Sequence, residues 1–142
     1  MAYQFPSPEW TAAYKDAVNA NQAYEQASAD WTHGAVAMVV KADKAIGLEN
    51  DAAMLLDVHQ GKCRNTEYFT NAEQAKNKAA FVIEAPYPLW KEVVQGKVEP
   101  IKAMMQNKLK LTKGALPTMI RYVEGSKQLV QSASQVPTEF VA

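Results

Sequence analysis

The segment that most restricts the fold runs from residue 52 to residue 69, where two strand-like runs flank the dipeptide Gln60–Gly61. "AAMLLDVH" precedes this dipeptide and "KCRNTEYF" follows it. A glycine in a two-residue loop supplies the positive φ that a tight hairpin turn requires, so the segment is predicted to be an antiparallel β-hairpin. In this register Val58 faces Cys63, and Asp57 faces Arg64 in a cross-strand ion pair.

Three other segments are predicted to complete a sheet of about five strands. "AVAMVV" (35–40) is a near-continuous apolar run with β-branched residues, and "AAFVIEA" (79–85) is similar. In "KLKLTK" (108–113), Leu109 and Leu111 share one face while the lysines face water.

The N-terminal third is predicted to be helical. Ser7 can cap a first helix that has Pro8 at its first position, and its apolar stripe includes Trp10 and Tyr14. A second helical stretch is expected to carry Tyr24 and Trp31 inward. Further along, Thr70 and Glu73 have capping-box spacing, which predicts a short helical turn after the hairpin.

The C-terminal part is predicted to contain two short helices and one long one. The short helices are "PYPLWKEVVQG", which ends at Gly96, and the segment around "VEPIKAMMQ", where helical spacing favours Met105 over Met104 for the inner stripe. The long helix is expected from Leu116 to the low 130s, with Gly125 as a weak point.

These elements predict an α+β fold, a five-stranded mixed α/β sheet covered by helices mainly on one face. No repeat, low-complexity tract or linker divides the chain, so residues 1–142 are expected to be a single domain. Within it, residues 1–32 form an N-terminal helical segment, and residues 33–142 form the sheet and C-terminal helices.

Charge and cysteine content exclude several classes of protein. Fifteen basic and fifteen acidic residues cancel, and no basic stripe appears, so no nucleic-acid partner is expected. The single cysteine, Cys63, excludes an intrachain disulfide. No signal peptide or membrane-spanning run is recognisable, so a soluble, cytoplasmic protein is expected.

The sequence carries no catalytic or metal-binding signature. His33 and His59 have no partner at ligand spacing and are interpreted as surface or turn residues. Cys63 is interpreted as a small buried hydrophobe rather than a nucleophile, and nothing brings Asp57 near Glu84 as an acid–base pair. No enzymatic activity, cofactor or metal is therefore predicted.

An ordered set of short motifs changes this picture. In chain order these are Gly61–Lys62, Gly96–Lys97, the strand Lys108-Leu109-Lys110-Leu111, and an amphipathic helix from Leu116 to Leu129. Over roughly residues 50–131 the chain resembles the sterol carrier protein type-2 family. It departs from the family pattern in turns, since Asn107 stands where the family often has glycine.

The resemblance implies a lipid-binding, lipid-transport protein with an apolar tunnel between the sheet and the C-terminal helices. Its hydrophobic ligand would be a fatty acid, acyl-CoA, phospholipid or sterol. Candidates for the tunnel wall are the apolar residues of the second half: Trp90, Val94, Ile101, Met104, Met105, Leu109, Leu111, Met119, Ile120 and Val123.

Two alternatives stay open at the level of sequence. Lys108 and Lys110 are either the solvated face of a strand or part of a transient contact with an anionic headgroup or membrane surface. The apolar face could also bind a partner enzyme or a second copy of the chain, as an accessory module would. The identity of the ligand and the oligomeric state do not follow from the sequence.

Overall fold

The computed structural model describes residues 2–141. Its elements, in chain order, are β1 (Tyr3–Phe5), α1 (Pro8–Asn19), α2 (Gln22–Ala27), β2 (Val36–Val40), the 3-10 turn η1 (Lys44–Ile46), β3 (Ala52–His59), β4 (Lys62–Phe69), α3 (Ala72–Lys78), β5 (Phe81–Ala85), α4 (Tyr87–Val94), α5 (Pro100–Met105), β6 (Lys110–Lys113), α6 (Leu116–Arg121), α7 (Val123–Gln135) and β7 (Thr138–Phe140).

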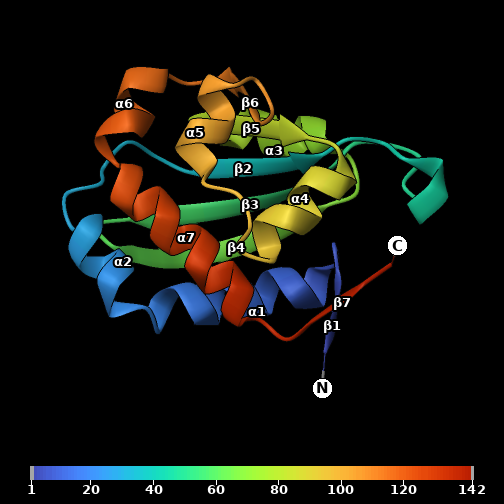
Figure 1. Cartoon of the computed structure of the whole chain (residues 1–142), viewed down its shortest axis with the longest axis horizontal. Helices are drawn as coiled ribbons and strands as arrows, with labels where there is room; N and C mark the ends of the chain where they lie inside the picture. The colour runs from blue at the N-terminus through green and yellow to red at the C-terminus, as the bar shows by residue number, and fades with distance from the viewer. Residues whose placement is uncertain (1, 142) are drawn as a thin grey trace.

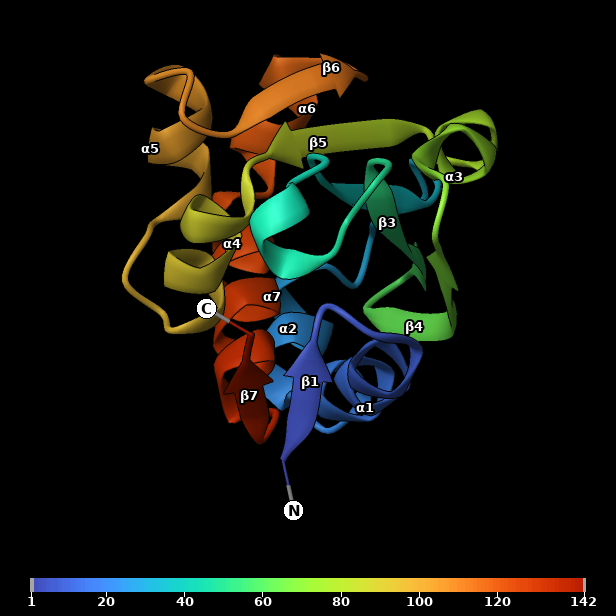
Figure 2. The same cartoon turned by 90° about the vertical axis from the view of Figure 1, so that its right-hand side faces the viewer.

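A five-stranded mixed sheet lies at the centre, in the order β4-β3-β2-β5-β6 (Figure 1). β2 and β5 are parallel neighbours, and the other pairs in this sheet are antiparallel. Figure 2 shows α4, α5 and α7 on one side of the sheet and α3 on the other. The predicted sheet, covered by helices mainly on one face, is confirmed.

Strand alternation sends side chains of the central strands to two separate cores. On β2, Val36 and Val40 enter the larger core under the helices, whereas Ala37 and Val39 enter a smaller core with alanines of α3. Because both faces of β2 are covered, its sequence reads as a continuous apolar run rather than an alternating one.

The predicted hairpin is confirmed, with one change of register. Gln60 and Gly61 have φ of 48° and 80°, and Val58 pairs with Cys63. A bulge after Asp57 places it opposite Asn65 instead of Arg64. The Arg64 guanidinium still reaches Asp57, at 3.0 Å, so the predicted ion pair is present.

The helix starts follow the predicted signals in one case and not in another. The Ser7 hydroxyl accepts a hydrogen bond from the backbone N–H of Trp10 at 3.0 Å and caps α1, as predicted. Asn71, not Thr70, caps α3, because its side-chain oxygen accepts from the N–H of Glu73 at 3.1 Å.

The single long C-terminal helix predicted from Leu116 is wrong. Tyr122, with φ of −107° and ψ of 36°, separates α6 from α7. Its ring packs edge-on against Trp31 with 4.8 Å between centroids, and also contacts His33. This long-range packing sets the break at Tyr122 and not at Gly125, which lies inside α7 where a β-carbon would collide with the Ser28 hydroxyl.

A second small sheet was not predicted. β1 and β7 pair in parallel, with Tyr3 opposite Thr138 and Phe5 opposite Phe140. Each strand has only three residues, too few to show a periodic pattern in the sequence.

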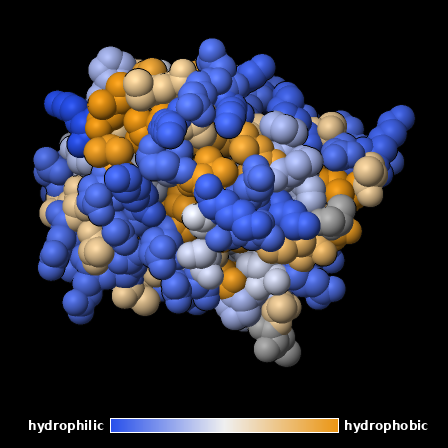
Figure 3. Space-filling model, in the orientation of Figure 1, coloured by the Kyte–Doolittle hydropathy of each residue, from blue (hydrophilic) through white to orange (hydrophobic). Residues whose placement is uncertain are grey.

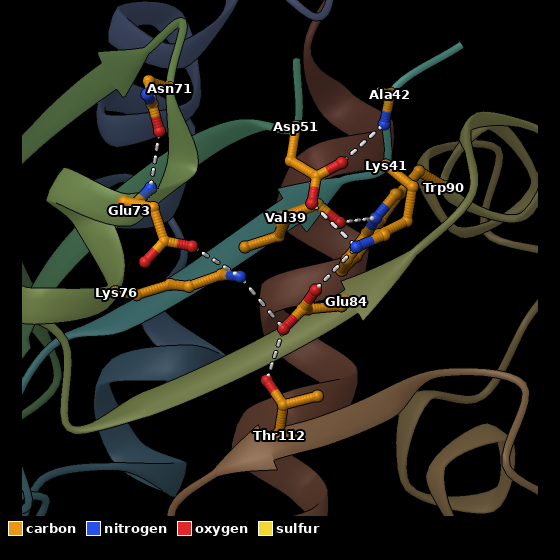
Figure 4. Close-up of polar contacts among 10 residues, drawn as sticks. All are labelled: Val39, Lys41, Ala42, Asp51, Asn71, Glu73, Lys76, Glu84, Trp90 and Thr112. Carbon is orange, nitrogen blue, oxygen red and sulfur yellow. Dashed lines mark hydrogen bonds and ion pairs between the residues drawn. The ribbon is translucent and has the colours of Figure 1, made fainter.

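Glu84 on β5 is the centre of a polar network at one end of the sheet (Figure 4). It accepts a hydrogen bond from Thr112 at 2.7 Å and forms ion pairs with Lys41 and Lys76. Lys41 also pairs with Asp51 at 2.7 Å. Burial opposes ionisation of Glu84 and Asp51, but these partners outweigh it and hold the pKa of both carboxyls below their usual values.

This network is expected to make stability depend on pH in the acid range. A carboxyl with a lowered pKa in the folded state stabilises the protein above its unfolded pKa, and that stability is lost as the pH falls below about 4. The urea midpoint should therefore fall with pH less steeply in Glu84→Gln than in the wild type. Glu67→Gln, which removes an exposed partner of Lys78, is the control and should retain the wild-type slope.

Candidate functional site

A narrow cavity of about 60 Å³ lies inside the larger core. Its floor is the helix-covered face of the sheet, where alternation on β2, β3 and β5 directs Met38, Met54, Val58 and Ile83 inward. Its walls come from α1, α4 and α7, with two residues from α5 and one each from α2 and α6. The helices therefore enclose the apolar face of the sheet without filling the space completely.

All three tryptophans line this cavity. Each indole N–H has a partner outside it: Trp10 donates to the Thr138 hydroxyl at 2.9 Å, Trp31 to the carbonyl of Gly34 at 3.0 Å, and Trp90 to the carbonyl of Val39 at 2.7 Å. With their polar atoms bonded elsewhere, the indole rings give the cavity an apolar wall.

The polar groups in the wall are neutral hydroxyls. The phenol of Tyr14 donates to the carbonyl of Leu129 at 2.9 Å. Burial raises the pKa of Tyr24 to about 12, although a hydrogen bond with Ser28 opposes the rise. Ser126 lies on the same side, on α7. Within residues 2–141 no charged side chain lines the cavity, so it suits an uncharged group or an apolar chain.

Five of the ten residues predicted from sequence as tunnel wall do lie at the cavity: Trp90, Val94, Met104, Leu109 and Met119. Their role in ligand binding stays a prediction. The other five lie elsewhere. Ile101 is buried but does not line the cavity, Leu111 and Val123 are half-buried, and Met105 and Ile120 are exposed.

The preference for Met105 over Met104 is wrong. Met104 is 5% exposed and lines the cavity, whereas Met105 is 65% exposed. α5 has only six residues, so a period of 3.6 does not decide between the i+3 and i+4 positions after Ile101. Packing against the rest of the core selects the i+3 position, Met104.

Sequence reasoning missed the aromatic side chains of the N-terminal third that line the cavity. These are Phe5, Trp10, Tyr14, Tyr24 and Trp31. The stripe on α1 predicted that Trp10 and Tyr14 face inward, and both are buried, but a periodic stripe does not distinguish a solid core from a cavity wall.

The reactive side chains singled out from sequence do not line the cavity. Cys63 is buried beside Val58, as predicted, and its thiol contacts the carbonyl of Asn65 at 3.4 Å. Burial raises the pKa of this thiol to about 11, which keeps it protonated near neutral pH. In the described part of the chain no cluster of three His, Cys, Asp or Glu side chains could hold a metal ion.

Among residues 2–141, no helix combines the length and the apolar composition needed to cross a bilayer. Figure 3 shows where apolar side chains reach the surface instead, over α6 and between α7, α5 and α4. Both regions border the helices that enclose the cavity.

A family model and several solved structures match most of this chain. The SCP-2 sterol transfer family matches residues 14–115. Among curated sequences, none matches significantly.

Solved structures agree with the family match. A crystal structure of sterol carrier protein 2 is 32% identical, with a TM-score of 0.85 over 92% of this chain and 97% of its own. A conserved hypothetical protein from Thermus thermophilus, described as possibly a sterol carrier protein, is also 32% identical, with a TM-score of 0.84 over 94% and 90%. Apo sterol carrier protein 2 from Yarrowia lipolytica shares the fold at 18% identity and a TM-score of 0.53, over 88% and 89%.

Proposed function

The chain belongs to the SCP-2 sterol transfer family, and we propose that it is a non-catalytic carrier that encloses the apolar part of a lipid in the cavity between sheet and helices. Binding or transfer of lipids or sterols is the general function of this family. The proposed ligand is a fatty acid, an acyl-CoA, a phospholipid or a sterol-like molecule.

The observation that carries the proposal is the chemistry of the cavity wall. Three indoles, four methionines and aliphatic side chains surround a space with no charged neighbour in the described part of the chain. Removing apolar ligand surface from water gains about 25 cal/mol per Å², so such a wall favours a hydrocarbon chain over a charged metabolite. The hydroxyls of Tyr24, Ser28 and Ser126 support a neutral polar group at the α2–α7 side.

The cavity is too small for a whole lipid unless its walls separate. Its volume of about 60 Å³ lies well below the roughly 300–1,000 Å³ of ordinary ligand pockets. Methionine side chains adapt readily to new contacts, and Met38, Met54, Met104 and Met119 all line the space. We therefore infer that the cavity widens around its ligand.

The tryptophans provide a direct test in solution. Bromine quenches indole fluorescence only near contact, so a brominated fatty acid held in the cavity should quench most of the tryptophan emission. The measurement is a titration of the purified protein with brominated stearate, with unbrominated stearate as the matched control. Saturable quenching by the first ligand alone supports the proposal.

The protein should first be extracted with organic solvent and the extract analysed by mass spectrometry, because a co-purified lipid would block the titration. A lipid-free extract together with unquenched fluorescence would count against a carrier. Mass spectrometry of the added fatty acid after incubation tests the non-catalytic part of the proposal. Chemical conversion of the fatty acid would contradict it.

A further inference from the structure

Three hydroxyl-bearing residues lie on one side of the cavity wall, where α2 packs against α7 (Figure 1). Tyr24 belongs to α2, Ser28 directly follows α2, and Ser126 belongs to α7. All three residues are buried, with exposed fractions of 2%, 3% and 8%. We call these three residues the hydroxyl cluster.

Contacts between the two helices hold the hydroxyl cluster in place. A β-carbon at Gly125 would lie 2.3 Å from the hydroxyl oxygen of Ser28, so only glycine leaves room for this hydroxyl beside Ser126. At the start of α2, the side-chain amide of Asn21 donates to the hydroxyl of Ser132 on α7 at 3.0 Å. The position of the cluster is therefore set by the packing of α2 on α7.

The hydroxyl cluster has hydrogen-bonding capacity that the protein does not use. Ser132 and Ser134 on α7 donate to carbonyls of their own helix at 2.9 and 2.7 Å, but within residues 2–141 no protein group bonds the hydroxyl of Ser126. Ser28 lowers the pKa of the Tyr24 phenol, as a donor to the phenol oxygen does. The O–H of Tyr24 is therefore left to donate elsewhere.

The unused capacity matches one kind of ligand group. A buried donor or acceptor without a partner is costly, and a ligand that supplies the partner removes this cost. A hydroxyl group can accept from the Tyr24 phenol and donate to the Ser126 oxygen, whereas a carbonyl can only accept. Since no charged side chain of the described residues lines the cavity, an ionised carboxylate would lose its hydration without compensation.

The size of the cavity favours a single chain behind that hydroxyl. A hydroxyl takes no more room than a water molecule, whose share of liquid volume is about 30 Å³. It therefore fits within the 60 Å³ of the cavity. A methylene chain is narrower than a fused ring system, so it displaces the surrounding helices least as it fills the space between them.

We propose that Tyr24, Ser28 and Ser126 form a binding subsite for the hydroxyl group of a single-chain alcohol, and that this subsite selects an uncharged end group over a carboxylate. The Tyr24 phenol donates to the ligand oxygen, the ligand donates to Ser126, and Ser28 orients the phenol. The proposal rests on the carrier function, because the chain of the alcohol occupies the same cavity.

The test is a titration of tryptophan fluorescence with three ligands that share one brominated chain. These are 12-bromo-1-dodecanol, its methyl ether, which cannot donate, and 12-bromododecanoic acid, which is ionised at pH 7. The wild-type protein should bind the alcohol about tenfold more tightly than the ether, as expected for one well-formed hydrogen bond. The preference over the acid should be at least as large.

Two matched variants assign the preference to the hydroxyl cluster. Tyr24→Phe/Ser126→Ala removes the two hydroxyls that contact the ligand and keeps the shape of the wall, so it should no longer prefer the alcohol. Tyr68→Phe/Ser134→Ala removes the same two groups from residues that do not line the cavity and should keep the wild-type preference. In Ser126→Ala alone, the urea midpoint should not fall, because this hydroxyl has no protein partner to lose.

The possible failures of the subsite and of the carrier function are distinguishable. Equal wild-type affinities for alcohol and ether, or tighter binding of the acid, would overturn the subsite and leave the carrier function standing. A preference that survives in Tyr24→Phe/Ser126→Ala, or that is lost in both double variants, would also overturn it. If neither the three ligands nor brominated stearate quenches the fluorescence, the carrier function is refuted and the subsite with it.

Discussion

Replacing Ala133 with leucine is expected to weaken fatty-acid binding about tenfold or more while making the ligand-free protein more stable. Ala133 lies on α7, is buried, and lines the cavity. A leucine would extend into the cavity, and each buried methylene contributes about 0.8 kcal/mol. After some loss to strain, we expect a gain of about 1 kcal/mol in the free energy of unfolding.

Affinity for the fatty acid falls while the free energy of unfolding rises, because the leucine and the ligand compete for the same space. Urea denaturation measures the gain in stability, and titration with a fluorescent fatty acid measures the loss of affinity. Ala75→Leu is the matched control: Ala75 is fully buried against the other face of the sheet, outside the cavity. Overpacking there should cost about 1–3 kcal/mol and leave affinity unchanged. Undiminished binding by Ala133→Leu would place the ligand elsewhere.

The largest loss of stability is expected from Gly61→Ala. Gly61 has φ of 80°, which disfavours any side chain, and its β-carbon would lie 2.5 Å from the backbone carbonyl oxygen of Glu25. The hairpin turn thus rests directly on the backbone of α2, and Lys62 forms an ion pair with Glu25 beside it. We expect a loss of about 3 kcal/mol in the free energy of unfolding, from backbone strain and from the displaced α2.

Gly47→Ala isolates the contribution of that contact. Gly47 has nearly the same φ, 79°, but open space where a β-carbon would be. Its replacement should cost only about 1 kcal/mol. Urea denaturation of the two variants side by side gives the difference, and equal losses would show that the approach to α2 contributes nothing to stability.

The Gly61–Lys62 dipeptide illustrates what a sequence can and does not predict. The hairpin follows from Gln60–Gly61 and its flanking strands, because turn geometry is local. That the same glycine also allows α2 to approach is a long-range property, and no residue near Gly61 in sequence indicates it. The single helix expected beyond Leu116 failed for the same reason, since Trp31 and His33 hold Tyr122 in a non-helical conformation.

The cavity wall was predictable only where local pattern and burial coincide. Trp90 and Val94 lie one helical turn apart on α4, and both reach the cavity. Ile120 follows a similar pattern, yet it is exposed while its neighbour Met119 is buried, because the six residues of α6 are too few for their spacing to decide which of the two faces inward. The N-terminal aromatics could be predicted as buried but not as wall, since a cavity is created by what its neighbours leave unfilled.

The β1–β7 pair joins the two helices α1 and α7, which both line the cavity, at one end. β1 leads into α1, β7 follows α7, and Trp10 on α1 is bonded to Thr138 on β7, so α1 and α7 are fastened to each other at this end. The opposite end of α7 meets α6 at Tyr122, where the helix is already interrupted (Figure 1). If the cavity widens around a ligand, we therefore expect α7 to move at its Tyr122 end, which is held by the rings of Trp31 and His33, and not at the end held by the β1–β7 pair. The packing of these three rings would then set the rate at which a ligand dissociates, separately from how well the cavity wall fits the ligand.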